Sequence, residues 1–467
     1  MSIDFSGTDR KLESTTVEIY VSQDHPLIKL ANTLDWQKIA ELVIDDLKKT
    51  TAKLRWWLGR KLKLRIHLGV FLLQSFSKMV DRGTEEAIKG NGIYQVFCGK
   101  TIVDKWHCPD HTKIEEFRNR LSPETQRKVV SYLVQVAEQF GFADPSKMDV
   151  DSTVQEANMA YPSDAQLLTK LTLLGKKVID YIKEQGKKGY NGAKQISVDL
   201  KAVKKKAKAY FFMAKNVSSE IKHTAFKALY ETVKEQMIPV IKACDVLDNE
   251  ILGNIPWNIK RSIDQIRSHA KKYLDDVAYF IETQTMKAGK ILSFHLKDVA
   301  CIMKGKLGKA KEFGRVFQLG RVGGNFFIVL PSTTVRQEDK LSLQLMVDEH
   351  ENIFGEGVLE SVATDKGYYS KKNEKILLEK IPEVGIQIPG NVKEQRTIDQ
   401  GLKNRRAGIE PLIGHVKNFG LRKSRMKSDE TTLAAGYRSV LGFNLHQFMR
   451  HQTKVKEKIL NEFSDSD

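Results

Sequence analysis

Apolar residues recur at the spacing of one helix face through most of the first 130 positions. Two clear sets are Ile39, Leu42, Val43 and Leu47, and then Leu64, Leu68, Phe71 and Leu72. Polar positions fill the remaining faces, as in helices that cover a core on one side. The pattern therefore predicts a helical N-terminal domain over residues 1–140.

The pattern changes to strict alternation in the segment KMDVDSTV, residues 147–154. Its apolar side contains Met148 and Val150, and the opposite side contains Asp149 and Asp151. Alternate residues of a strand share one face, so both aspartates should project from the same side of a sheet. We assign residues 141–164 to the first part of an α/β domain.

Helical spacing returns over residues 165–289. The apolar positions are Leu167, Leu171, Leu174 and Val178, then Leu229, Val233 and Met237, then Ile259, Ile263, Ile266 and Leu274. These amphipathic stretches follow one another without an intervening strand pattern. We expect an all-helical insertion here.

Alternation resumes in KILSFHL, residues 290–296, and in NFFIVL, residues 325–330, as in paired antiparallel strands. The Lys- and Gly-rich stretch between them predicts loops, and GRVGG (320–324) predicts a hairpin connection. Residues 290–425 thus form the second part of the α/β domain.

Three further elements complete this part of the chain. We expect strands at Val358–Thr364 and Val384–Ile388, with a helix between them at Lys371–Lys380. Residues 426–467 form a C-terminal helix, from Asp429 to about Thr453, and a tail. The order of strands and helices indicates an α/β unit that the insertion interrupts.

The charge of the chain narrows the class of partner. Its 76 Lys and Arg exceed its 58 Asp and Glu, for a formal net charge of +18. Such an excess attracts a polyanion, and nucleic acid is the main candidate, although a generally basic solvated surface is the alternative.

Two segments concentrate this charge. In RWWLGRKLKLR two tryptophans lie among cations that suit a phosphate backbone: Arg55, Arg60, Lys61 and Lys63. In KAVKKKAKAY, residues 201–210, Lys204 and Lys205 belong to a lysine-rich helix face. The alternatives are a helix end with Trp packed on the core for the first segment and a solvated helix face for the second.

The cysteines indicate neither a disulfide framework nor a standard metal site. They lie far apart, at Cys98, Cys108, Cys244 and Cys301. The group Cys98, His107, Cys108 and His111 does not have the spacing of a zinc finger, so ordinary packing is expected. The N-terminus is polar and the richest apolar stretch, LGVFLLQSF, is too short to span a bilayer, which predicts a cytoplasmic protein without a membrane partner.

Three acidic residues stand where a divalent metal site is expected. Asp151 lies on the predicted strand, Asp365 ends the apolar run of VATDKGYYS, and Glu410 lies in RRAGIEPLIGHVK. Carboxylates are the ligands that Mg²⁺ prefers, and two such ions can activate water and stabilise a leaving oxygen at phosphorus. The structural alternatives are an edge residue, a helix N-cap and a salt-bridged helix face, respectively.

The segment around Glu410 predicts one helix face with a particular composition. Arg406, Glu410, Gly414 and Lys417 lie at offsets of −4, 0, +4 and +7. This face offers one metal ligand, two cations and a small residue that allows close approach.

Together these motifs resemble bacterial insertion-sequence transposases of the DDE class. The resemblance rests on DSTV, YPSD, TDKGYYS and R-x3-E-x6-K in that order, with DHPLIKLANTLDW, FCG and FRNRL before them and KGK and EFG between them. One departure is Lys403, where the family often has a tyrosine.

The resemblance implies an RNase H-like catalytic domain, a mixed sheet flanked by helices, with acids on the first strand, after the fourth strand and on a following helix. By position the catalytic and metal-binding residues are Asp151, Asp365 and Glu410, with two Mg²⁺ or Mn²⁺ ions. The family pattern favours Asp151 over Asp149, and Arg406 and Lys417 match its basic members.

The implied activity is cleavage at transposon ends followed by strand transfer into target DNA. The partners would be double-stranded terminal inverted repeats and target DNA, in a homodimer associated with the bacterial nucleoid. Two alternatives remain open: a catalytically inactive, transposase-derived DNA-binding protein, and a metal-dependent nuclease without strand transfer.

Overall fold

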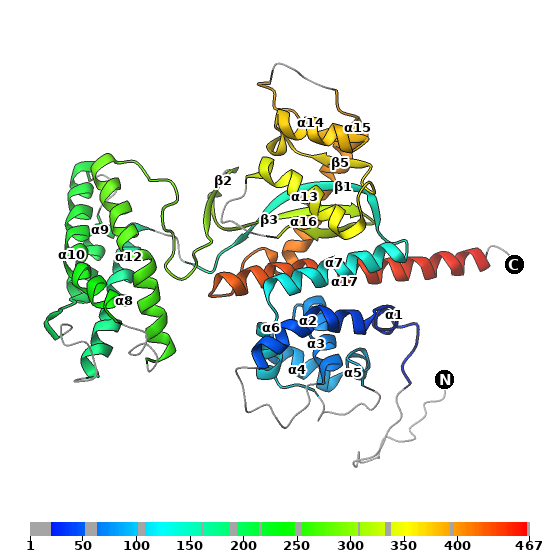
Figure 1. The fold of residues 1–467 in the computed structure, drawn as a ribbon, viewed down its shortest axis with the longest axis horizontal. Helices are drawn as coiled ribbons and strands as arrows, with labels where there is room; N and C mark the ends of the chain where they lie inside the picture. Colours follow the sequence, from blue (N-terminus) through cyan, green and yellow to red (C-terminus); the bar gives the residue numbers. More distant parts are fainter. Residues whose placement is uncertain are drawn as a thin grey trace, which may run out of the picture.

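The computed structural model describes residues 20–51, 63–100, 108–159, 163–185, 194–213, 217–247, 255–306, 309–331, 338–392 and 397–464. Figure 1 shows three regions: a twisted sheet with its helices, a group of N-terminal helices, and a separate helical bundle. Two long helices, α7 and α17, run between the sheet and the N-terminal group.

The N-terminal region is helical, as its periodicity predicts. Its elements are α1 (Pro26–Thr33), α2 (Trp36–Thr51), α3 (Leu64–Ser77), α4 (Asp81–Gly90), α5 (Gly92–Phe97), α6 (His111–Arg120) and α7 (Pro123–Gln139). The start of α7 follows from local sequence: the Ser122 hydroxyl accepts from the Thr125 amide, and Pro123 stands at the first helical position. Both features satisfy or remove amide donors that a helix start leaves unpaired.

The sheet is mixed and contains six strands. They are β1 (Asp144–Glu156), β2 (Ala300–Lys306), β3 (Lys309–Gly323), β4 (Phe326–Val329), β5 (Ser361–Thr364) and β6 (Glu383–Ile386). The order is β2-β3-β1-β5-β6, and β4 pairs with β3. The central strand β1 is antiparallel to β3 and parallel to β5, so the predicted mixed sheet is confirmed.

Five helices that follow in the chain pack with the sheet or with one another. They are α13 (Asp339–Phe354), α14 (Lys371–Lys380), α15 (Gln400–Ala407), α16 (Ile409–Val416) and α17 (Asp429–Ser464). The buried side chain of Asn444 on α17 accepts from the Phe327 amide at 2.9 Å and donates to the Phe327 carbonyl at 2.8 Å. This pair satisfies backbone groups of β4 that would otherwise be buried without partners.

One apolar core joins the N-terminal helices to the sheet. Val130 of α7, Phe327 of β4 and Phe448 of α17 are all buried in it. Because these elements share a core, the N-terminal helices and the sheet form a continuous packed body.

The helices between β1 and β2 have a core of their own. They are α8 (Asp164–Glu184), α9 (Leu200–Phe211), α10 (Ser219–Asp245) and α12 (Trp257–Thr283). Leu171, Val233 and Ile263 are fully buried in this second core. The bundle stands beside the sheet in Figure 1, as an inserted unit would.

The strand predicted at residues 290–296 is wrong. This segment is irregular, and its alternation reflects burial in two different places. Phe294 packs edge-on against Tyr273 of the bundle at 5.2 Å, whereas Leu296 packs with Val299. The paired strands β2 and β3 instead form in the Lys- and Gly-rich stretch expected to be loops. Glycine suits position 314 of β3, because a Cβ there would lie 2.0 Å from the Gln155 carbonyl oxygen of β1.

The other elements match their predictions closely. A hairpin joins β3 to β4 through Gly324 and Asn325, both of which have positive φ, as a two-residue hairpin turn requires. The helix at Lys371–Lys380 is present. β5 lies within its predicted range, and β6 overlaps its predicted range but begins one residue earlier, at Glu383. Within the described part of the chain, no helix has the length and apolar character needed to cross a membrane.

Candidate active site

Asp151 lies in the middle of β1, the central strand. Its side chain is 14% exposed, and its Oδ1 accepts from the Ser152 amide at 2.7 Å. Strand alternation brings Asp149 to the same face, as predicted, but the two aspartates have different surroundings.

Asp149 is buried between two arginines. It accepts from Arg321 Nε at 2.9 Å and from Arg405 Nε at 2.6 Å, and only 2% of the residue is exposed. All its strong contacts are therefore within the protein, which suits a structural role that ties β1 to β3 and α15.

Asp365 follows β5, the strand parallel to β1. The register pairs Val150 with Thr364, so Asp151 and Asp365 are each the next residue along. Asp365 Oδ1 accepts from the Gly367 amide at 2.9 Å, the N-cap contact considered as its structural alternative, and Oδ2 faces Arg406. Asp365 follows the fifth strand in chain order, whereas the resemblance implies the fourth. Four strands, β1 to β4, precede β5.

The single helix predicted through Arg406, Glu410 and Lys417 is wrong. The chain forms α15, bends at Gly408, continues as α16 and then enters a π-helical turn, Lys417–Leu421. Pro411 explains the bend, because it has no amide to donate to the carbonyl four residues earlier. The apolar residues of α16 pack inward, with Ile409, Ile413 and Val416 buried.

Arg406 brings the three acids together. Its Nη1 donates to Glu410 Oε1 at 2.8 Å, and its Nη2 lies 3.4 Å from Asp151 Oδ2 and 3.6 Å from Asp365 Oδ2. Acids from β1, the end of β5 and α16 therefore surround one guanidinium. Glu410 is the most accessible, with 63% of its side chain exposed.

The electrostatics of this cluster disfavour ionised carboxylates. Burial raises the pKa of Asp151, Arg406 and the Ser152 amide lower it, and the charges of Asp365 and Glu410 raise it, which together give a pKa of about 6. Burial also raises the pKa of Asp365, with a contribution from Asp339. A bound cation would relieve this repulsion.

Asp339 is a nearby acid that the sequence reasoning missed. It opens α13, and its Oδ1 accepts from Gln318 Nε2 at 2.7 Å. The only sequence signal was an acid in the first turn of a helix, which is common at helix starts.

The donor chemistry of the cluster fits a hard divalent cation. Within the described residues, no three Asp, Glu, His or Cys side chains lie close enough together to hold a metal ion as they stand. In this cluster the Arg406 guanidinium contacts all three acids. The three carboxylates around that positive charge are oxygen donors of the kind that Mg²⁺ and Mn²⁺ bind.

The predicted basic residues are distributed over all three regions. Lys417 is half-buried in the turn after α16, whereas Lys63 is exposed at the start of α3. Lys204 and Lys205 are exposed on α9 of the bundle. Three predicted DNA-binding residues lie outside the described residues: Arg55, Arg60 and Lys61.

The Cys and His group has no metal-site geometry among the described residues. Burial raises the pKa of the Cys98 thiol to about 12 and of the Cys108 thiol to about 11, so neither is a thiolate at neutral pH. His111 contacts Glu85 through Nδ1 at 2.9 Å, and His107 lies outside the described residues. Ordinary packing, as expected, describes these cysteines.

Comparison with known proteins finds a family match in the N-terminal region. Residues 15–120 match the family described as Transposase domain (DUF772). The chain is also 23% identical over 158 residues to "Uncharacterized protein ORF8 in nfe locus" of Rhizobium meliloti, covering 33% of this chain and 72% of that protein. No solved structure matches the chain significantly. The family match supports a transposase role, and with it DNA binding.

Proposed function

We propose that this protein is a DDE-class DNA transposase with an RNase H-like catalytic domain. The observation that carries the proposal is the convergence of Asp151, Asp365 and Glu410 on one guanidinium from three separate elements. The family match over residues 15–120 and the mixed sheet with β1 at its centre support it independently.

The three carboxylates would hold one or two Mg²⁺ or Mn²⁺ ions between the central strands and α16. When bound, such ions supply activation of water and stabilisation of the leaving oxygen at a phosphodiester. Asp151 and Asp365 provide rigid donors because each is held by a backbone amide. Glu410, which is exposed on α16, would complete the set of metal ligands from the side of that helix.

Arg406 has a second role when DNA is bound. Its guanidinium carries the positive charge nearest to the carboxylates, so it would bind a phosphate oxygen beside the scissile bond. The reaction then uses one site twice: water attacks at the transposon end, and the freed 3′-hydroxyl attacks target DNA. The resemblance adds terminal inverted repeats and target DNA as substrates, in a homodimer.

The test is cleavage of DNA that carries the element's own ends. We expect Mg²⁺-dependent nicking and strand-transfer products from the wild type, with at least a thousandfold loss in Asp365→Asn and unchanged DNA affinity. Nicking without joined products would favour a nuclease, and end binding without nicking would favour an inactive DNA-binding protein.

A further inference from the structure

Two clefts meet along the segment that follows α16, residues 417–428. The first, of about 780 Å³, lies between this segment and the N-terminal helices. The second, of about 900 Å³, lies between the end of the segment, α6 and α12 of the bundle. We call the two clefts together the cationic trough.

The charged residues that line the first cleft are almost all positive. Seven cations and one carboxylate line it: Lys78, Arg118, Lys417, Arg422, Lys423, Arg425 and Arg438, with Asp81. Asp81 is ion-paired to Arg118, and its charge also acts on Arg438. The pKa of Arg438 falls to about 9, chiefly through burial and also through the charge of Arg118.

The cations of the connecting segment face solvent without acidic partners. Arg422, Lys423 and Arg425 are exposed, and none forms an ion pair with a carboxylate among the described residues. Clustered like charges repel each other, so a protein keeps them together at a cost unless an anion covers them. This arrangement therefore indicates a polyanionic ligand.

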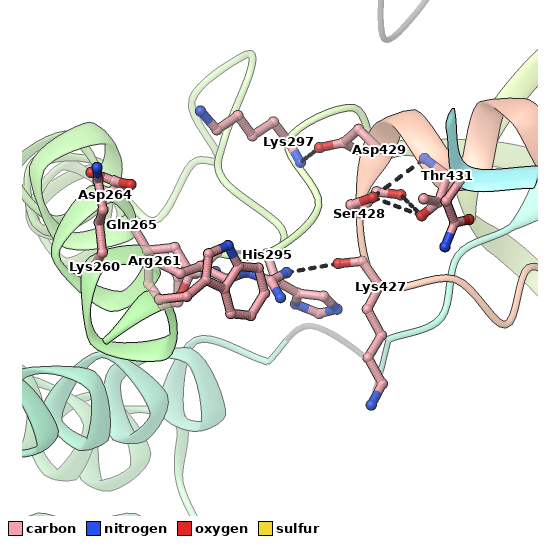
Figure 2. Close-up of a pocket in the computed structure, with 13 residues that line it drawn as sticks. Lys260, Arg261, Asp264, Gln265, His295, Lys297, Lys427, Ser428, Asp429 and Thr431 are labelled. Carbon is pink, nitrogen blue, oxygen red and sulfur yellow. Dashed lines mark hydrogen bonds between the residues drawn. The ribbon is translucent and has the colours of Figure 1, made fainter. Parts of the chain in front are cut away.

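The second cleft continues the positive surface toward the bundle. Figure 2 shows Arg261 of α12 donating to the Lys427 carbonyl, at 2.8 Å, which ties the bundle to the segment. Lys260, Lys297 and Lys427 are exposed here, and with Arg261 these cations outnumber the two acids of the cleft, Asp264 and Asp429. Trp257, 71% exposed, also lines this cleft.

The trough begins beside the proposed active site. Its segment follows directly from α16, which carries Glu410, and Gln155 of β1 lines the first cleft. Gln155 is four residues beyond Asp151, a distance of about 13 Å along a strand. A bridge between Glu156 and Lys423 joins the segment to the same strand. Duplex DNA, with one charge per about 1.7 Å of its axis, spans such a distance easily.

We propose that the cationic trough binds the phosphate backbone of duplex DNA next to the scissile bond, running from the carboxylates between the N-terminal helices and the bundle. Lys423, Arg425 and Lys427 are its central contacts. This assignment rests on the proposed function, because it places the DNA relative to the three acids.

The test compares two triple variants with equal charge loss. The trough variant is Lys423→Gln, Arg425→Gln and Lys427→Gln, and the control is Lys372→Gln, Lys375→Gln and Lys380→Gln at exposed positions of α14. Binding of a fluorescein-labelled duplex carrying the element's end is measured by anisotropy in EDTA at several KCl concentrations, so that cleavage does not interfere. Circular dichroism establishes that each variant is folded.

We expect the trough variant to bind at least thirtyfold more weakly than the wild type and the control less than threefold more weakly. The slope of log Kd against log salt should fall by about 3 in the trough variant, at about 0.9 per phosphate contact. The charge-preserving variant Lys423→Arg, Arg425→Lys and Lys427→Arg should bind like the wild type. Equal losses in trough variant and control, or no loss in either, would overturn the assignment.

Trp257 provides an independent readout for the second cleft. Subtracting the emission of Trp257→Phe from that of the wild type isolates its fluorescence, and DNA should quench this signal. An unchanged signal would overturn the extension of the DNA into this cleft. If the trough assignment fails, the proposed function is still tested by cleavage with Asp365→Asn. A wild-type protein that binds no duplex DNA at all would overturn the proposed function itself.

Discussion

Arg406 and Glu410 are joined by a 2.8 Å hydrogen bond across the bend between α15 and α16. The same guanidinium contacts Asp151 and Asp365, so all three acids share its single positive charge in the absence of another cation. A divalent ion bound as proposed would therefore compete with Arg406 for the same carboxylates. A phosphate that draws Arg406 outward would open the cluster, which would couple DNA binding to metal loading.

Removing this competitor should strengthen metal binding. Arg406→Gln is expected to bind Mn²⁺ about tenfold more tightly than the wild type without DNA, a difference of about 1.4 kcal/mol. Isothermal titration calorimetry measures the affinity directly. Lys403→Gln is the control, since it removes one positive charge from an exposed position of the same helix. Unchanged or weaker Mn²⁺ binding in Arg406→Gln would contradict the competition.

Substitution of Asp149 and of Asp151 by Asn should change the free energy of unfolding in opposite directions. Asp149→Asn leaves two arginines without their shared counter-charge in a buried place, so we expect a loss of about 3 to 5 kcal/mol in the free energy of unfolding. Urea unfolding followed by circular dichroism measures it. A variant as stable as the wild type would show that Arg321 and Arg405 find other partners.

Asp151→Asn should instead stabilise the metal-free protein. The pKa of Asp151 is about 6 in the folded state and about 4 when unfolded, so the folded state binds this proton more tightly. Stability then falls as pH rises from 4 to 6, and ionised Asp151 costs up to about 3 kcal/mol above pH 6. In EDTA the variant should gain up to this amount at pH 7.5 and nothing at pH 3.5. A gain that is the same at both pH values would rule out ionisation as its cause.

The sequence located the acids because each stands at a position with a strong local signal. Alternation around Val150 and the abrupt end of an apolar run at Thr364 were enough to bring Asp151 and Asp365 to neighbouring parallel strands. The prediction of Glu410 depended on the R-x3-E-x6-K motif, because an exposed glutamate on a helix gives no local signal of its own. The roles of these residues stay predictions, while their convergence is a property of the fold.

Long-range packing is what the sequence did not reveal. The alternation of Phe294 and Leu296 predicts a strand, because alternation along the chain does not distinguish one core from two. In the fold the two side chains enter different cores. The central position of Arg406 depends on the bend at Gly408, and the cationic trough depends on three regions meeting. Neither follows from residue spacing along one element.

Protonation of His350, which lies outside the cluster of three acids, should also make the stability of the protein depend on pH. It is fully buried on α13, its Nε2 lies 2.8 Å from the Pro145 carbonyl oxygen, and its ring stacks obliquely on Phe354. Burial lowers its pKa to about 4, while the contact with Pro145 opposes that shift. The unfolded chain therefore takes up this proton near pH 6.5, and the folded protein does so only near pH 4.

Stability from His350 is complete above pH 6.5 and is lost as pH falls toward 4, by about 3 kcal/mol in total. His350→Gln keeps a donor for the Pro145 carbonyl but has no titrating group. Its urea unfolding midpoint should fall less than that of the wild type between pH 7 and pH 4.5. Since all other titrating groups are common to both proteins, the difference between the two curves isolates His350. Parallel curves would mean that His350 is protonated in the folded protein at a pH near its ordinary value.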